Sequence, residues 1–194
     1  MRKLKTILAI IFVTGLFVGC GEPEVVESNT IQVQKDGSIT DVIVDDFDQN
    51  LYSIDELQSM TEDEIAQYET TDGAGKITLD SIEMVEDKLH VTMTFAGYAD
   101  YAAYNDTDIF VGTLADAYNA GYSLDVSMVS AKDTDTVLVK DDLMQMGLSK
   151  VVITDYDGII RCPNKILYYS QGTSQIDKKH VNGTAGELTY VIYK

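Results

Sequence analysis

The chain has 194 residues, of which 45% are hydrophobic and 24% charged, with two Pro and two Cys. This composition is that of an ordinary globular protein and excludes a disordered, collagen-like or disulfide-stapled chain. Acids outnumber bases by 32 to 14, and three of the bases, Arg2, Lys3 and Lys5, lie at the very start. A field of this sign repels nucleic acid and anionic lipid headgroups, which excludes both as partners.

The charge is unevenly spread along the chain. Residues 36–72 contain twelve acids and no Lys or Arg, whereas residues 158–194 contain five bases and only two acids. We expect the acidic stretch to form a solvated surface that keeps the protein soluble, with a dedicated cation-binding face as the alternative.

The first residues are typical of an export signal. Residues 1–5 carry the three positive charges, and residues 6–19 form an uncharged apolar run. This run is too short to cross a bilayer, which takes about 20 apolar residues in a helix. The pattern therefore predicts a secretory signal peptide rather than a permanent membrane span.

The end of this run, Leu16-Phe17-Val18-Gly19-Cys20, resembles the lipobox of bacterial lipoproteins, with Phe17 where Leu is usual. The resemblance implies that a diacylglyceryl group is attached to Cys20, which becomes the new N-terminus after cleavage. Two acyl chains give stable anchoring, so the protein would be tethered to the extracytoplasmic face of the cell membrane. The alternative is a conventional cleaved leader with an incidental cysteine. We expect a signal peptide over residues 1–19, a tether over 20–30 and one domain over 31–194.

Three segments of the remaining chain, residues 37–50, 95–105 and 112–118, look like uncharacterised lipid-anchored proteins of Gram-positive bacteria. The resemblance implies a location at the membrane and brings no activity with it.

The first half of this domain should contain two hairpins and a helix between them. Residues 31–46 alternate around Asp36-Gly37, and residues 76–96 alternate around Asp87 with a change of phase near Asp80. These patterns predict hairpins, the second with a β-bulge at Asp80 and Ser81 and with His90 on its solvated face. Ser53 and Glu56 predict a helix start, and Thr61 offers a possible second start with a kink.

The second half should be a mixture of short strands and helices. Residues 98–104 predict a short helix, and residues 109–129 predict a compact strand–helix–strand step with Thr113 as the helix cap and a strand over 124–129. A tight turn is expected at Asn182-Gly183, and further elements at 137–139, 141–146, 150–156, 158–162, 166–169 and 187–193. The sequence thus predicts a single α+β domain with a mainly antiparallel β-sheet and a few short helices.

No pattern in the sequence is a catalytic, cofactor or metal signature. Residues 46–50 begin like a calcium loop, but Leu51 and Leu57 stand where the loop needs Gly and Glu. We therefore expect a strand end and a loop that leads into a helix, with an adventitious weak cation site as the alternative. His90 and His180 have no His or Cys at ligand spacing, so a zinc site is not expected. We therefore predict no catalytic residue, no cofactor and no metal site.

Cys162 and a row of tyrosines are the remaining candidates. With Cys20 lipidated, Cys162 has no disulfide partner, and we expect it to pack as a small buried side chain at a strand end rather than to act as a reactive thiol. Tyr98, Tyr101 and Tyr104 recur every three residues, which favours packing of a helix against the core over a platform for carbohydrate.

The functional expectation follows from the predicted location and from the lack of a catalytic pattern. The first hypothesis is a non-catalytic binding or interaction module of the cell envelope, with an unknown ligand or protein partner. The alternative is a small cell-envelope hydrolase that acts on cell-wall or imported material, and the sequence leaves open whether the protein is an enzyme.

Overall fold

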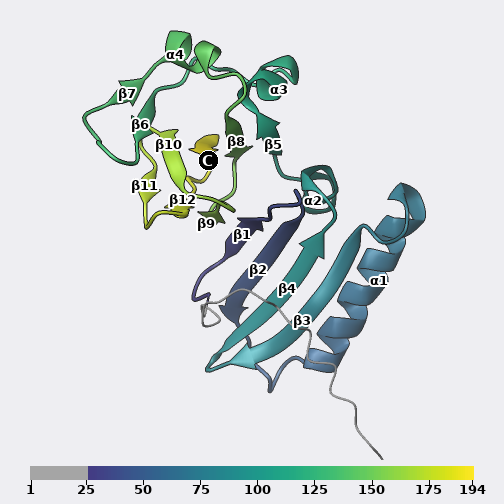
Figure 1. Cartoon of the computed structure of the whole chain (residues 1–194). Coiled ribbons are helices and arrows are strands. Elements are labelled where there is room, and N and C mark those ends of the chain that lie inside the picture. Colours follow the sequence, from purple (N-terminus) through teal and green to yellow (C-terminus); the bar gives the residue numbers. More distant parts are fainter. Residues whose placement is uncertain (1–25) are drawn as a thin grey trace, which may run out of the picture.

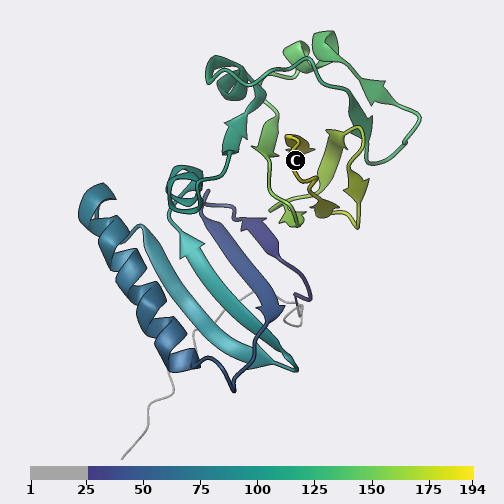
Figure 2. The same ribbon diagram turned by 180° about the vertical axis from the view of Figure 1, so that it is seen from behind.

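A computed structural model describes residues 26–194, so Cys20, the predicted signal peptide and most of the predicted tether lie outside the described residues. The described chain is an α+β domain built on two mainly antiparallel sheets, as the sequence predicted. Figure 1 shows the two sheets meeting along β1, β9 and β12, with the chain passing from the first sheet to the second after α2. Figure 2 shows the same arrangement from behind.

Sheet A has seven strands in the order β11-β12-β9-β1-β2-β4-β3. All its neighbouring strands are antiparallel except β1 and β9, which are parallel. Its strands are β1 (Thr30–Val33), β2 (Ile39–Asp46), β3 (Ile77–Val85), β4 (Lys88–Phe95), β9 (Ile159–Arg161), β11 (Ser174–Gln175) and β12 (His180–Asn182).

The two predicted hairpins form the larger part of this sheet. In the β1–β2 turn, Gly37 has a φ of 92°, a left-handed conformation that glycine adopts without steric cost. In the β3–β4 pair, the register shifts between Leu79 and Ser81, which confirms the predicted bulge. The β11–β12 pair was not predicted, because its strands have only two and three residues and lack a clear alternation.

Helix α1 (Ile54–Asp72) is one continuous helix that lies alongside β3 (Figure 1). The Ser53 side chain accepts a hydrogen bond from the Glu56 amide, as expected of the N-cap residue. The Thr61 hydroxyl donates to the carbonyl of Leu57, 2.9 Å away, so Thr61 is inside the helix and does not start a second one. Ile65 is the buried residue through which α1 joins the core.

Sheet B has six strands in the order β5-β8-β13-β10-β6-β7, and all neighbours are antiparallel. Three short helices accompany it: α2 (Tyr98–Asn105), α3 (Leu114–Asn119) and α4 (Lys140–Gln145). Its strands are β5 (Ile109–Thr113), β6 (Met128–Ser130), β7 (Val137–Leu138), β8 (Lys150–Thr154), β10 (Ile166–Ser170) and β13 (Thr189–Tyr193).

The predicted strand over residues 124–129 is wrong in its extent. The chain runs as a loop until β6 begins at Met128, and β6 is separated from β5 by β8, β13 and β10. The connection therefore crosses one face of sheet B instead of forming a compact step. Leu124 is only 3% exposed because this loop packs on that face. The packed loop therefore has apolar residues at alternate positions, as a half-buried strand would.

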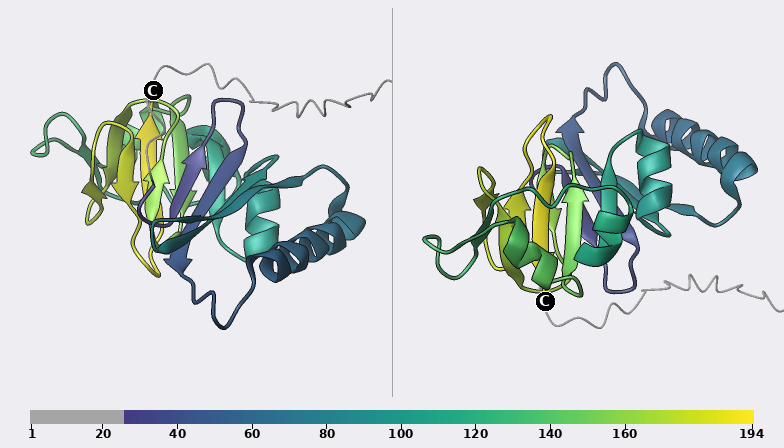
Figure 3. Two further views of the ribbon diagram at one scale, coloured as in Figure 1. Left: turned by 90° about the horizontal axis from the view of Figure 1, so that it is seen from below. Right: turned by 90° about the horizontal axis from the view of Figure 1, so that it is seen from above.

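Alternation along sheet B places a core on each of its faces. Val152, Val191 and Tyr193 point to a core shared with sheet A, α1 and α2. Their neighbours in sequence, such as Ile153 and Ile192, point to a second core covered by α3, α4 and the loop before β6. Figure 3 shows these helices on the side of sheet B away from sheet A. Sheet A shares a core on one face only.

Gly183 is required by a close approach and not by a turn. A Cβ atom at this position would lie 1.9 Å from the carbonyl oxygen of Tyr156, which no side chain can tolerate without movement of the backbone. Its amide donates to the carbonyl of Gly158 at 2.7 Å, which joins the end of β12 to the start of β9. The glycine thus lets three segments of chain meet at the junction of the two sheets.

Candidate binding face on sheet A

A row of polar side chains crosses six strands on the face of sheet A that is turned away from the shared core. Each member lies directly opposite the next in the strand register. Their chain neighbours Val33, Ile39 and Phe95 point to the core, because successive side chains alternate across a strand. We call this set the cross-strand row; from β3 to β12 it consists of Thr78, Thr94, Thr40, Gln32, Arg161 and His180.

Hydrogen bonds link two pairs of these side chains and also connect the row to Gln34 and Asp80. The Thr94 hydroxyl donates to Asp80 Oδ2 at 2.7 Å, and the hydroxyls of Thr40 and Thr94 are 3.4 Å apart. Gln34 Nε2 donates to the Thr40 hydroxyl at 3.1 Å. Further along the row, Arg161 Nη1 donates to Gln32 Oε1 at 3.0 Å. The polar groups are therefore held in defined positions before any ligand binds.

Two hollows lie over the row and share Gln32 and Arg161. The larger is a groove of about 1170 Å³, lined by residues of β1–β4 and by the segment that follows β9. The smaller measures about 240 Å³ and is lined by β1, β9, the β11–β12 turn and residues 26–28. A face that is both polar and hollowed in this way is a candidate binding surface.

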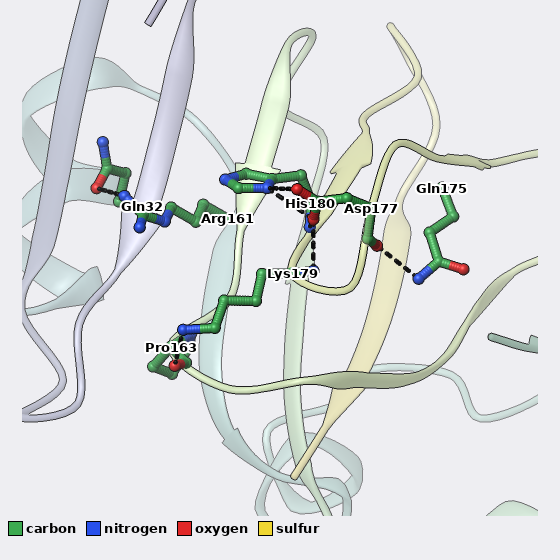
Figure 4. Close-up of polar contacts among 7 residues, drawn as sticks. All are labelled: Gln32, Arg161, Pro163, Gln175, Asp177, Lys179 and His180. Carbon is green, nitrogen blue, oxygen red and sulfur yellow. Dashed lines mark hydrogen bonds and ion pairs between the residues drawn. The ribbon is translucent and has the colours of Figure 1, made fainter. Parts of the chain in front are cut away.

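At the β12 end, a carboxylate fixes the turn that carries His180 (Figure 4). Asp177 accepts hydrogen bonds from the amides of Lys179 and His180, and His180 Nδ1 lies 2.8 Å from Asp177 Oδ1. Burial alone would raise the pKa of Asp177, but these bonds and the histidine outweigh it and hold the pKa below its usual value. The His180 side chain is only 12% exposed, so its ring is fixed at the edge of the smaller hollow.

The groove is richer in positive charge than the chain as a whole. Lys35, Arg161 and Lys179 line it, against the two acids Asp36 and Asp80. The Lys179 ammonium donates to the carbonyl of Pro163 at 3.1 Å, which fixes the position of its charge (Figure 4). Asp36 accepts hydrogen bonds from the hydroxyl and from the amide of Ser38, and these two bonds lower the pKa of its carboxyl group.

Cys162 lies directly beneath this face. It follows Arg161 at the end of β9, points to the core and is fully buried, as predicted. Burial raises the pKa of its thiol to about 12, which keeps it protonated and unreactive near neutral pH.

The structure keeps the other sequence candidates apart from one another. His180 belongs to the cross-strand row, whereas His90 lies on β4 opposite Val44. Residues 47–50 lie in the expected loop between β2 and α1, and Asp46, the last residue of β2, contacts the Lys88 ammonium at 2.6 Å. Among the side chains that the structure describes, no three from His, Cys, Asp or Glu are arranged to hold a metal ion.

The tyrosines of α2 pack, as their spacing favoured. Tyr101 is 2% exposed and meets Phe95 edge-on with ring centroids 5.0 Å apart. Tyr98 contacts the ring of Phe110, and Tyr104 contacts those of Phe95 and Tyr68. All three rings are on the covered side of sheet A, away from the groove.

Comparison with known protein families, characterised proteins and solved structures found no match. The candidate site is therefore identified from the geometry of its residues alone. None of the helices in the described part of the chain is long and apolar enough to span a membrane.

Sequence reasoning missed the row, although part of the signal was visible. The alternation in residues 88–96 predicted a solvated outer face for β4, and Gln32 and Gln34 stood out between apolar residues. Bringing Gln32 beside Arg161 needs a parallel pairing between residues 129 positions apart, which no local pattern encodes.

Proposed function

We propose that the protein is a lipoprotein anchored through Cys20 at the extracytoplasmic face of the cell membrane, and that it is a non-catalytic binding module of the cell envelope. Its ligand would lie across the open face of sheet A. The observation that carries this proposal is the cross-strand row, a preformed line of polar side chains under two connected hollows.

The scaffold suits a binding function because the row rests on a rigid support. The chain neighbours of the row residues point to the core and are fully or nearly fully buried, among them Ile31, Ile39 and Phe95. A rigid sheet loses little conformational entropy when a ligand binds to it, and this small loss favours affinity.

The proposed anchor would keep this face close to the membrane. Val26, Glu27 and Ser28 line the smaller hollow, and six residue steps separate Val26 from Cys20. Because a fully extended chain spans at most about 3.4 Å per residue, this hollow would lie within about 20 Å of the lipid. The ligand would then be a component of the envelope near the membrane surface.

The second candidate, a small hydrolase, draws support from the contact between His180 and Asp177. A carboxylate at one ring nitrogen orients the other, which in Figure 4 points toward the side of Arg161. A hydrolase of this kind would use His180 as a base toward water. It would lose its turnover in a His180→Gln variant that keeps its melting temperature.

Two measurements test the binding module. Intact-mass analysis of membrane-extracted protein should find chains that begin at Cys20 and carry diacylglycerol, and a Cys20→Ala variant should leave the membrane. A thermal-shift screen with muropeptides, wall polymers and peptides should find a ligand whose stabilisation is lost in Gln32→Leu. Retention of the Cys20→Ala variant at the membrane would contradict the anchor. A ligand that stabilises Gln32→Leu as well as the wild type would contradict the binding face.

A further inference from the structure

We infer that the groove on sheet A binds an extended anionic polyol, a hydroxyl-rich chain whose acidic groups are phosphate or carboxylate. This inference rests on the proposed binding function and names its ligand class. Three features of the groove support it: the placement of its charges, the chemistry of its polar groups and its length.

Cations gather at one end of the groove. Lys35, Lys179 and Arg161 lie at the end formed by β1 and β9, where Asp36 is the one acid in the lining, while Asp80 lies on β3 at the other end. Both lysines are exposed, and the single protein contact described for the Lys179 ammonium uses one of its three donors. In a chain with 32 acids and 14 bases, such a concentration of cations requires a reason, and an anionic ligand supplies one.

The middle of the groove offers hydroxyl and amide groups. Thr40, Thr92, Thr94 and Gln34 line it, and each of these side chains can both donate and accept hydrogen bonds. This chemistry matches ligand hydroxyls. The described lining includes no aromatic ring, so the groove lacks the surface on which a flat apolar sugar face would stack.

The groove is too long for a free ion or a single small sugar. Four strand spacings separate β3 from β9, and at about 4.8 Å each they span about 19 Å. A ligand that reaches from the threonines to the lysines must therefore be a chain. Its acidic groups would meet Lys35 and Lys179 while its hydroxyls meet Thr40 and Thr94.

The test is calorimetric titration of the full chain, purified in detergent, with four probes that vary charge and hydroxyl content separately. Oligo(glycerol phosphate) and oligogalacturonate carry both features, maltoheptaose carries only hydroxyls, and oligoglutamate carries only charge. We expect at least one of the first two to bind at least tenfold more tightly than either of the others. Equal binding of maltoheptaose or of oligoglutamate would overturn the inference.

Matched lysine variants locate the charge. The double variant Lys35→Gln/Lys179→Gln should weaken binding of the anionic polyol at least tenfold and reduce its dependence on salt. The control Lys132→Gln/Lys178→Gln removes the same charge outside the groove and should change affinity less than twofold. Equal losses in the two variants would show that only the overall charge matters, which would contradict a built site.

The outcomes also separate this inference from the proposed function. If none of the four probes binds but wall fragments or peptides still stabilise the wild type and not Gln32→Leu, the ligand class is wrong and the binding face stands. If no envelope component acts through Gln32, both proposals fail.

Discussion

The two faces of sheet A are built from alternate residues of the same strands, yet they differ in almost every physical property. On the covered face, Ile31, Ile39 and Phe95 are fully buried against sheet B and the helices. On the open face, their immediate neighbours are polar: the hydroxyls of Thr40 and Thr94 share a hydrogen bond, and Gln32 accepts one from Arg161. One face supplies stability, and the other presents polar groups over the two hollows.

The covered face contains one exception, the carboxyl of Asp41. It is 3% exposed, and among the described residues its Oδ1 has no hydrogen-bond partner. Burial raises its pKa to about 7, an effect that a hydrogen bond from Tyr101 only partly offsets. Asp41 is therefore the polar group that the covered face tolerates least when ionised.

The largest expected effect is on the covered face. Replacing Phe95 by Ala removes a fully buried ring and its edge contact with Tyr101, and should lower the free energy of unfolding by about 3–5 kcal/mol. Thr94→Ala, one residue away on the open face, should cost less than about 1 kcal/mol. Denaturant titration of both variants measures the contrast. Similar losses of unfolding free energy in the two variants would show that the covered face does not supply most of the stability.

A smaller effect is expected from Asp41→Asn. The folded-state pKa lies above the unfolded value, so the wild type should lose stability as pH rises from about 4 to about 7 and then level off. The Asn variant lacks this titration and should be more stable than the wild type at pH 8, by up to about 4 kcal/mol. Urea unfolding between pH 4 and pH 8 provides the comparison. Parallel pH profiles for the two proteins would show that Asp41 is not buried in this way.

The tyrosines of α2 should rank by their burial. Tyr101→Ala should cost about 3 kcal/mol or more, and the half-buried Tyr98 and Tyr104 should each cost less. Thermal unfolding of the three variants gives the order. A Tyr104→Ala protein that keeps its melting temperature but loses carbohydrate binding would revive the platform hypothesis.

The smallest effect on stability is expected at the end of β9, where Arg161 and Cys162 are neighbours on opposite faces. Their difference can be measured by thiol labelling. In a Cys20→Ala background, Cys162 should resist a thiol reagent at pH 8 in the native state and react rapidly in denaturant, because its buried thiol has a pKa of about 12. Arg161→Gln should leave this protection unchanged, since its side chain is on the opposite face. Rapid native labelling of Cys162 would show that β9 is exposed on both sides.

The fold could be predicted from the sequence wherever the signal was local. The turn at Gly37, the N-cap at Ser53 and the bulge near Asp80 each depend on neighbouring residues, and the structure confirms all three. The extent of the 124–129 strand was wrong, because a loop packed on a sheet buries Leu124 as a strand would.

The candidate site could not be predicted from local sequence patterns. The cross-strand row joins β1, β9 and β12 through pairings between distant parts of the chain, so its residues looked unrelated in the sequence. What could be seen in advance was the excess of bases after residue 158, which the structure brings to one end of the groove through Arg161 and Lys179.

We propose that the open face of sheet A is the surface that binds the ligand. The most direct measurement is a map of backbone amide chemical shifts during titration with oligo(glycerol phosphate) or with whichever envelope fragment stabilises the protein. We expect the largest shift changes at the amides of Gln32, Thr40, Thr94 and Arg161, and no change at the amides of α3 and α4 beyond sheet B. Changes centred on α3 and α4, with the row unmoved, would contradict it.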